Sequence, residues 1–240
     1  MKRLRILLTN DDGYNAYGIN LLKEKLSKYG DVTIIAPLEH MSGKSASITI
    51  NNGFQFKQVS EGKYVINGTP ADCVAFGLIY FKQYFDVVIS GCNYGFNISY
   101  DTIYSGTIGA CLQALTQNIP AIAFSCQFNF EIVEKYFDDV FEFILNNDLI
   151  DNRYLLNVNF PLGEEIKDIK ISTLFHKNYY RFISEKEDGY YVDREYLNGG
   201  EDKNSDCYLV KNGVVSITPL SGSLFNEAYY KENVKKLKNK

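Results

Sequence analysis

The chain has 240 residues, 45% of them hydrophobic and 22% charged, which is enough apolar material for a packed core and argues against wholesale disorder. Its formal net charge of −4 argues against binding of a nucleic-acid duplex, which needs a basic face that displaces counterions. No apolar run approaches the length of a membrane span and the first residues lack the apolar stretch of a signal peptide, so we expect a cytoplasmic protein with no membrane contact.

The cysteines are odd in number and widely spaced, and no CxxC pair occurs among them. This pattern favours neither a zinc ribbon nor a disulfide framework, so we expect free core thiols in a reducing compartment. The five are Cys73, Cys92, Cys111, Cys126 and Cys207.

In the first half of the chain, short apolar runs alternate with segments of helical periodicity. Strands are expected at Leu4–Thr9, Asp31–Ala36, Phe85–Ser90 and Ala121–Ser125. Helices are expected at Gly18–Tyr29, Ala71–Phe81, Thr107–Thr116 and Phe130–Leu145. Strands that alternate with helices predict an α/β fold with right-handed crossovers and a mostly parallel sheet.

The pattern changes near residue 150. Strands are expected at Leu155–Phe160 and Val214–Thr218, the stretch Asp168–Asn204 is of uncertain order, and Tyr229–Lys240 is expected to form a helix or to fray. We therefore expect an α/β catalytic core at residues 1–150. Residues 151–240 are expected to form a β-rich extension with a C-terminal helix, continuous with the core and able to reach a partner subunit.

A polar cluster, Asn10-Asp11-Asp12-Gly13, follows the first strand directly. Ligand sites of open α/β sheets form outside the carboxyl ends of the strands. Two adjacent carboxylates repel each other there unless a cation lies beside them, and oxygen ligands suit Mg²⁺ or Mn²⁺. Because Asn, Asp and Gly are also favoured turn residues, a simple turn remains the alternative for this cluster alone.

Three further polar clusters lie where strands or loops meet helices, at Met41–Ser47, Ser90–Asn97 and Tyr104–Ala110. The first is not a P-loop, because Leu38 stands where that motif needs glycine. The second offers asparagine oxygens and amides, and the third opens a helix whose N–H groups suit a phosphate. Each alone is more often a capped helix or a turn, but the four together favour metal-assisted chemistry on a phosphate.

The chain resembles the SurE family, a family of acid phosphatases that act on nucleoside 5′- and 3′-monophosphates. The strings that carry the resemblance span most of the chain. They are TNDDG (Thr9 to Gly13), AP…SGKS (Ala36 to Ser45), NGTPADCV (Asn67 to Val74), SGCNYGFN (Ser90 to Asn97), YSGTIGA (Tyr104 to Ala110), PAIAFS (Pro120 to Ser125), LNVNFP (Leu156 to Pro161) and VSITPLS (Val215 to Ser221). The resemblance implies a Rossmann-like three-layer core, an extension that swaps between protomers, and a homodimer or homotetramer.

The resemblance also implies one divalent ion per subunit, Mg²⁺ or Mn²⁺, and a set of site residues. The implied metal ligands are Asp11, Asp12, Ser42 and Asn93, of which the two aspartates are also the expected catalytic residues. The expected phosphate and substrate contacts are Asn10, Gly43, Asn97, Ser105, Gly106 and Thr107. The chain departs from the family at Cys92, where isoleucine is common, and at Ser205-Asp206-Cys207-Tyr208.

The functional hypothesis is a 5′-nucleotidase, a phosphomonoesterase that hydrolyses nucleoside 5′-monophosphates, and with them 3′-monophosphates, by metal-activated water. The alternative is a nucleotide- or phosphate-binding module without turnover. A phosphatase with an aspartyl intermediate would want DxD, whereas here the two aspartates are adjacent. A receiver-type domain would need an aspartate at the end of a later strand. His40 and His176 are expected to be surface or structural residues rather than proton donors.

Overall fold

The computed structural model describes residues 3–82, 85–175, 179–196, 202–223 and 225–238. A nine-stranded sheet runs through the body of the molecule in the order β3-β4-β2-β1-β5-β6-β7-β11-β8. Its strands are β1 (Leu4–Thr9), β2 (Gly30–Pro37), β3 (Phe56–Ser60), β4 (Lys63–Ile66), β5 (Val87–Tyr94), β6 (Ala121–Cys126), β7 (Leu155–Asn159), β8 (Asp168–Ile171) and β11 (Val214–Leu220). The pairs from β4 to β7 are all parallel, whereas β3 and β11 run antiparallel to their neighbours β4 and β7.

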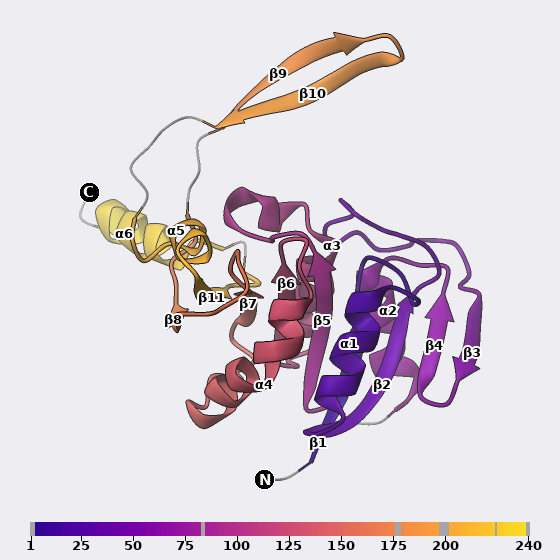
Figure 1. Cartoon of the computed structure of the whole chain (residues 1–240). Helices are drawn as coiled ribbons and strands as arrows, with labels where there is room; N and C mark the ends of the chain where they lie inside the picture. The colour runs from indigo at the N-terminus through magenta and orange to yellow at the C-terminus, as the bar shows by residue number, and fades with distance from the viewer. Residues whose placement is uncertain (1–2, 83–84, 176–178, 197–201, 224, 239–240) are drawn as a thin grey trace.

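Helices cover both faces of the sheet, which makes three layers (Figure 1). The helices are α1 (Tyr17–Leu26), α2 (Pro70–Tyr80), α3 (Gly106–Thr116), α4 (Glu131–Asn146), α5 (Asp206–Lys211) and α6 (Glu227–Lys238), with a short 3-10 helix, η1 (Ser99–Ile103). One core cluster packs α1 and α4 on one face, and a second packs α2 and α3 on the other. The α/β class, the mostly parallel sheet and the additional C-terminal strands are confirmed.

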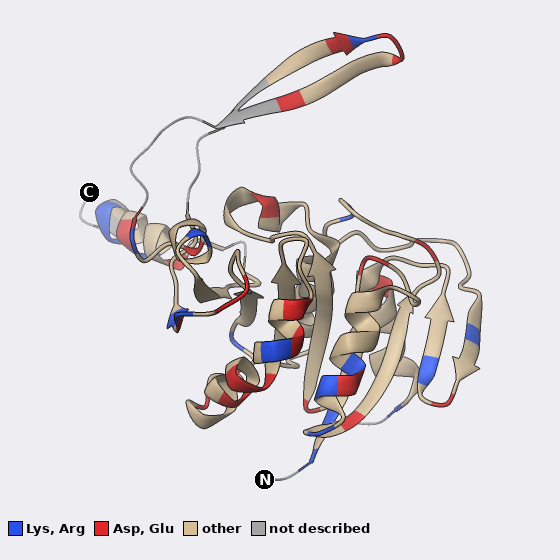
Figure 2. Ribbon diagram, in the orientation of Figure 1, with Lys and Arg blue, Asp and Glu red and all other residues tan. Residues whose placement is uncertain are grey.

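Helix α4 shows why this layer order is stable. Its apolar side chains recur at helical spacing, and Val133, Phe137, Val140, Phe141 and Ile144 are all fully buried. Its outer face is charged, and Figure 2 shows positions of acidic and basic residues along the ribbons of α1 and α4. Burial of the apolar stripe against the sheet is what holds the helix in place.

Several elements differ from the sequence expectations. Strand β5 continues to Tyr94, four residues beyond the expected end, because Asn93 and Tyr94 pair with β6 after an irregularity in the register that follows Ser90. The hairpin of β3 and β4 was not predicted, since β3 is almost entirely exposed and carries no apolar run. Helix η1 and helix α5 were also not predicted.

The C-terminal part of the chain contributes to two sheets. Strands β7, β11 and β8 join the central sheet, whereas β9 (Tyr179–Lys186) and β10 (Gly189–Tyr196) form a separate antiparallel hairpin that projects from the body (Figure 1). The region of uncertain order therefore holds β8, β9 and β10. The C-terminal segment is helical, as α6.

All five cysteines are buried and free, as expected. Among the described residues, none of the helices has the length and apolar character needed to cross a membrane.

Candidate active site

The four polar clusters converge at the carboxyl edge of the parallel strands. Strands β1 and β5 pair with Thr9 opposite Ser90, so the residues that follow each strand leave the sheet side by side. The strand order reverses between β1 and β5, because β2 lies on the other side of β1. Such a switch point is where open α/β sheets bind ligands.

Asp11 lies at the centre of this edge and is only 3% exposed. Its Oδ1 accepts a hydrogen bond from Thr107 Oγ1 at 2.7 Å, and its backbone carbonyl oxygen accepts one from the Met41 N–H at 2.7 Å. Burial raises the pKa of Asp11 to about 6, partly offset by the Thr107 hydroxyl, and the neighbouring Asp12 raises it further. These two hydrogen bonds hold Asp11 in position. The groups that lower its pKa do not outweigh the effect of burial.

Asp12 lies on the outer side of Asp11. Its Oδ2 accepts the Tyr94 N–H at 3.4 Å, and its Oδ1 lies 3.4 Å from Nδ1 of His40, whose side chain is 61% exposed. Burial raises the pKa of Asp12, against the effects of the Tyr94 N–H and of His40. His40 therefore lies within the site's surroundings, beside Asp12, while His176 lies outside the described residues.

The loop after β2 brings Ser42 and Gly43 to the same edge. Ser45 secures the loop, because its N–H donates to the Tyr104 carbonyl oxygen at 3.0 Å and its hydroxyl donates to the Ile103 carbonyl oxygen at 2.7 Å. The loop backbone lies directly on α3 at Gly109, where an added Cβ would be 2.0 Å from the Ser45 oxygen. Glycine is thus required at this position by close backbone approach.

Two asparagines come from the end of β5 and the loop after it. Asn93 Nδ2 donates to the Gly95 carbonyl oxygen at 2.8 Å, which leaves its Oδ1 as the atom for a cation. Asn97 is 5% exposed, and its Nδ2 donates to Ser125 Oγ at 2.9 Å.

The first turn of α3 packs on Asp11. Ser105 caps the helix by accepting the Ile108 N–H at 3.2 Å. A Cβ on Gly106 would lie 2.9 Å from the Asp11 Cβ, so only glycine permits this approach. The first turn of α3 thus lies against the Asp11 carboxylate, to which the Thr107 hydroxyl donates, and the N-terminus of a helix also favours a phosphate nearby.

A cavity of about 200 Å³ opens at this edge. Six of the expected site residues line it, namely Asp11, Ser42, Gly43, Asn93, Asn97 and Ser105. Asp12, Gly106 and Thr107 lie beside it, in contact with Asp11 or with residues that line it. Asn10 lies behind it, fully buried, with Nδ2 donating to the Gly13 carbonyl oxygen at 2.9 Å.

The cavity also has walls that the sequence expectations did not include. These are Phe96, Asp101 and Tyr104. Phe96 and Tyr104 belong to the clusters Ser90–Asn97 and Tyr104–Ala110, and Asp101 lies in the segment that joins them; this position was the available signal. Because both clusters reach the same edge of the sheet, the segment between them has to border the site.

The residues present fit a hard divalent cation. The pKa values of buried Asp11 and partly buried Asp12 are both raised, and Asn10 Oδ1 is buried without a hydrogen-bond partner in the described part of the chain. Ser42 and Asn93 add neutral oxygens. Within the described ranges, no three or more His, Cys, Asp or Glu side chains gather as for a metal ion, so the candidate donors are two carboxylates together with the neutral oxygens of Ser42 and Asn93.

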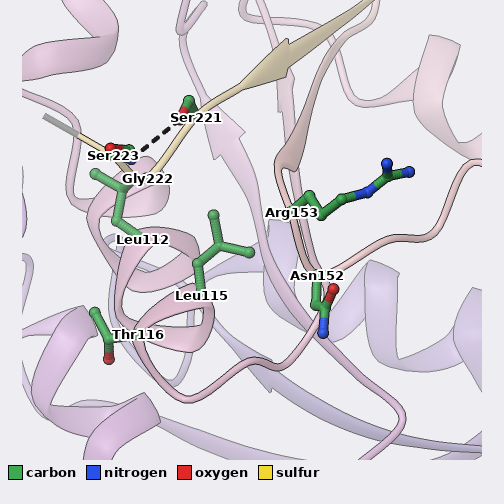
Figure 3. Close-up of a pocket in the computed structure, with 8 residues that line it drawn as sticks. All are labelled: Leu112, Leu115, Thr116, Asn152, Arg153, Ser221, Gly222 and Ser223. Atoms are coloured by element: carbon green, nitrogen blue, oxygen red, sulfur yellow. Dashed lines mark hydrogen bonds between the residues drawn. The ribbon is translucent and has the colours of Figure 1, made fainter. Parts of the chain in front are cut away.

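A second cavity, of about 270 Å³, lies at the far end of α3 (Figure 3). Its eight lining residues are Leu112, Leu115, Thr116, Asn152, Arg153, Ser221, Gly222 and Ser223, and none is a carboxylate. Figure 3 shows the two leucines beside Gly222, with the Arg153 guanidinium extending away from them. Arg153 pairs with Asp151 at 2.6 Å. This cavity lacks the donors that the first one gathers.

The chain is similar to known proteins of one family. The model of the family described as "Survival protein SurE" matches residues 6–181. A protein of Clostridium botulinum (strain Kyoto / Type A2) named "5′-nucleotidase SurE" is 40% identical, over 93% of this chain and 95% of its own. One of the same name from Haemophilus influenzae (strain 86-028NP) is 36% identical, over 92% of each.

Among solved structures, the SurE protein from Aquifex aeolicus superposes with a TM-score of 0.84 at 34% identity, covering 97% of this chain and 99% of that one. The family match extends over well over half of the chain, and the relatives are aligned over nearly their full length. The chain belongs to the SurE family.

Proposed function

We propose that this protein is a 5′-nucleotidase, a metal-dependent phosphomonoesterase that converts nucleoside 5′-monophosphates to nucleoside and phosphate. Nucleoside 3′-monophosphates are further candidate substrates. The observation that carries the proposal is the pair of adjacent carboxylates, buried Asp11 and partly buried Asp12, at a cavity whose lining includes neutral oxygen and amide groups. The name "5′-nucleotidase SurE" of the relatives supports the same reaction.

In this proposal Asp11, Asp12, Ser42 and Asn93 hold one divalent ion, Mg²⁺ or Mn²⁺. Bound there, the ion would polarise a phosphoryl oxygen and lower the pKa of a coordinated water. Thr107 fixes the Asp11 carboxylate through its 2.7 Å hydrogen bond.

The phosphoryl group has its own partners in the proposal. The Asn97 amide, the Ser105 hydroxyl and the first N–H groups of α3 bind the phosphoryl oxygens, and Gly43 allows close approach of the loop backbone. The burial of these groups excludes water from the non-reacting side of the phosphate. Contacts of Asn10, Gly106 and Thr107 with the phosphate remain predictions. In this structure Thr107 and Gly106 contact Asp11, and Asn10 donates within the turn that follows β1.

We also propose that the protein acts in the cytoplasm as a homodimer or homotetramer, assembled through the extension at residues 151–240, with residues 1–150 as the catalytic core. The projecting β9–β10 hairpin supports this division, because a two-stranded hairpin has little stability without a surface to cover it.

The proposal is tested by phosphate release from a panel of nucleoside monophosphates with Mn²⁺, with Mg²⁺ and after chelation. Asp11→Asn is measured beside the wild type, with its melting temperature as a check of folding. Release that needs a divalent ion and is lost in Asp11→Asn is expected. If folded protein bound nucleotide but released no phosphate with any metal, the binding-module alternative would replace the enzyme.

A further inference from the structure

The peptide backbone of Asn97 is held by side chains of β7. Asn159 accepts the Asn97 N–H at its Oδ1 (2.9 Å) and donates from Nδ2 to the Asn97 carbonyl oxygen (3.1 Å). Asn157 Nδ2 donates to the same carbonyl oxygen at 2.7 Å. Both polar groups of this backbone unit therefore have partners from a strand that does not line the cavity.

These amides form one closed network. Asn159 Nδ2 also lies 3.3 Å from Asn157 Oδ1, and Asn97 Nδ2 donates to Ser125 Oγ on β6. Asn157, Asn159 and Ser125 are fully buried. Because an unpaired buried amide is costly, a network in which each member satisfies another favours a single geometry.

Asn97 lies in a loop between β5 and η1, outside the strands of the sheet, so strand pairing does not hold its backbone and side chains have to do so. The loop leaves β5 after Tyr94 and reaches η1 at Ser99. At that end a second buried side chain holds it, since Asp206 Oδ2 accepts the Ser99 N–H at 2.8 Å. The segment Asn97–Ser99 is thus fixed at both ends by side chains from the second part of the chain.

We propose that Asn159 is a positioning residue that sets the Asn97 amide against the substrate phosphate, an inference that rests on the proposed phosphomonoesterase function. One Nδ2 hydrogen of Asn97 is donated to Ser125. The direction of the other Nδ2 hydrogen and of Oδ1 then depends on the position of the Asn97 backbone. Asn159 fixes the position of that backbone, because it bonds both the N–H and the carbonyl oxygen of Asn97. Without it, the Asn97 N–H is buried without its partner and the loop relaxes, which moves the amide away from the phosphate.

The test is a double-mutant cycle measured with adenosine 5′-monophosphate and Mn²⁺. Asn159→Ala is expected to lower kcat/KM by about tenfold to a hundredfold, the effect of misplacing a binding group. Because Asn159 acts through Asn97, the double variant should lose little more than Asn97→Ala alone. Ser216→Ala is the matched control. Ser216 is the ladder neighbour of Asn159 and is buried, with Oγ unpaired in the described part of the chain, so this variant should keep full activity.

A second variant covers the case in which Asn159→Ala does not fold. Asn159→Asp keeps the shape and the acceptor for the Asn97 N–H but has no N–H for the Asn97 carbonyl oxygen. It should raise the inhibition constant of inorganic phosphate while its Mn²⁺ affinity stays at the wild-type value. A structural role alone would lower the melting temperature and leave the inhibition constant unchanged.

The inference is overturned if both Asn159 variants keep wild-type kcat/KM and phosphate inhibition, or if the losses of Asn159→Ala and Asn97→Ala add in full. If the wild type binds inorganic phosphate but hydrolyses nothing, the proposed function fails, and the role of Asn159 is then decided by the phosphate affinity of the same variants. If the wild type binds no phosphate, both proposals fail.

Discussion

The Asp11 carboxylate is buried between the first turn of α3 and a second carboxylate, and this environment determines its pKa. In the unfolded chain its pKa is the ordinary 3.8, whereas burial raises it to about 6 in the fold. Between these values the folded protein holds more protons than the unfolded chain. The free energy of unfolding therefore falls as the pH rises through this window, by up to about 3 kcal/mol for this group.

The first prediction compares metal-free wild type with Asp11→Asn, which removes the charge and keeps the shape. As the pH rises from about 4 to about 7, the wild type should lose free energy of unfolding relative to the variant. Denaturant titrations at several pH values measure this difference. Adding Mn²⁺ at neutral pH should reverse it, because the ion binds only the wild-type carboxylate. A difference that does not change with pH would contradict the burial argument.

The second prediction concerns Thr107, whose hydroxyl lowers the pKa of Asp11. Thr107→Val keeps the volume and removes the donor, so the pKa of Asp11 should rise further. Since protons compete with the metal ion for this carboxylate, the pH at which Mn²⁺ binding is half lost should move upward in the variant. Calorimetric titration of Mn²⁺ over a pH series measures this midpoint. Thr116→Val, at the exposed end of the same helix, is the control and should leave the midpoint unchanged.

At the residue scale, Asp11, Asp12, Ser42 and Asn93 could be found from the sequence because each follows or ends a readable strand or loop, and the structure brings them to one edge; their role as metal ligands stays a prediction. The order of the clusters indicates that the segment between them borders the site, but not that Asp101 and Tyr104 are residues that line the cavity. Their positions depend on η1, and this short helix is held by a tertiary contact from Asp206 to the Ser99 N–H. Contacts of that kind, between segments about a hundred residues apart, leave no local periodicity to read.

At the scale of elements, the site depends on how closely the loop after β2 lies against α3. Gly109 is the point of contact, with the Ser45 carbonyl oxygen at 2.0 Å from a built Cβ. Any side chain there has to push the loop away, and with it Ser42 and Gly43. The atoms that a Cβ at Gly109 would meet belong to the loop backbone, which cannot rotate aside as a flexible side chain can. The loop therefore has to move as a unit.

The third prediction is that Gly109→Ala lowers kcat/KM by about tenfold or more and weakens Mn²⁺ binding, because a shift of the loop by about 1 Å displaces a metal donor. The cost in free energy of unfolding should be about 1–3 kcal/mol, as for other overpacked sites. Gly53→Ala is the control, since nothing lies within 4 Å of a Cβ there. Wild-type activity in Gly109→Ala would show that the loop does not position the site.

Most elements of the central sheet could be predicted because buried parallel strands are continuous apolar runs and α4 carries a clear apolar stripe. The end of β5 could not be predicted in this way. Ser90, Gly91 and Asn93 are turn formers, yet pairing with β6 extends the strand through them and buries Ser90 and Gly91. Tertiary pairing thus overrides the local preference and places Asn93, a predicted metal ligand, on a strand paired with β6.

At the scale of the whole molecule, the second part of the chain has two roles. Its strands β7, β11 and β8 extend the central sheet, and β7 also supplies the amides behind Asn97. Its hairpin instead projects outward (Figure 1). Cross-strand partners Ile183 and Val192 on this hairpin are 72% and 65% exposed. The sequence carries no periodic signal for this hairpin, because the apolar and polar residues of its two strands do not alternate regularly.

The last prediction concerns this hairpin. An exposed apolar cross-strand pair on an isolated hairpin is stable when a second copy covers it. We expect the wild type to sediment with the mass of a dimer or tetramer, and Ile183→Asp combined with Val192→Asp to shift the mass to that of a monomer. Glu187→Ala, in the exposed turn of the same hairpin, should leave the mass unchanged. A monomeric wild type at all concentrations would contradict the assembly. A double-aspartate variant that keeps the oligomer would place the interface elsewhere.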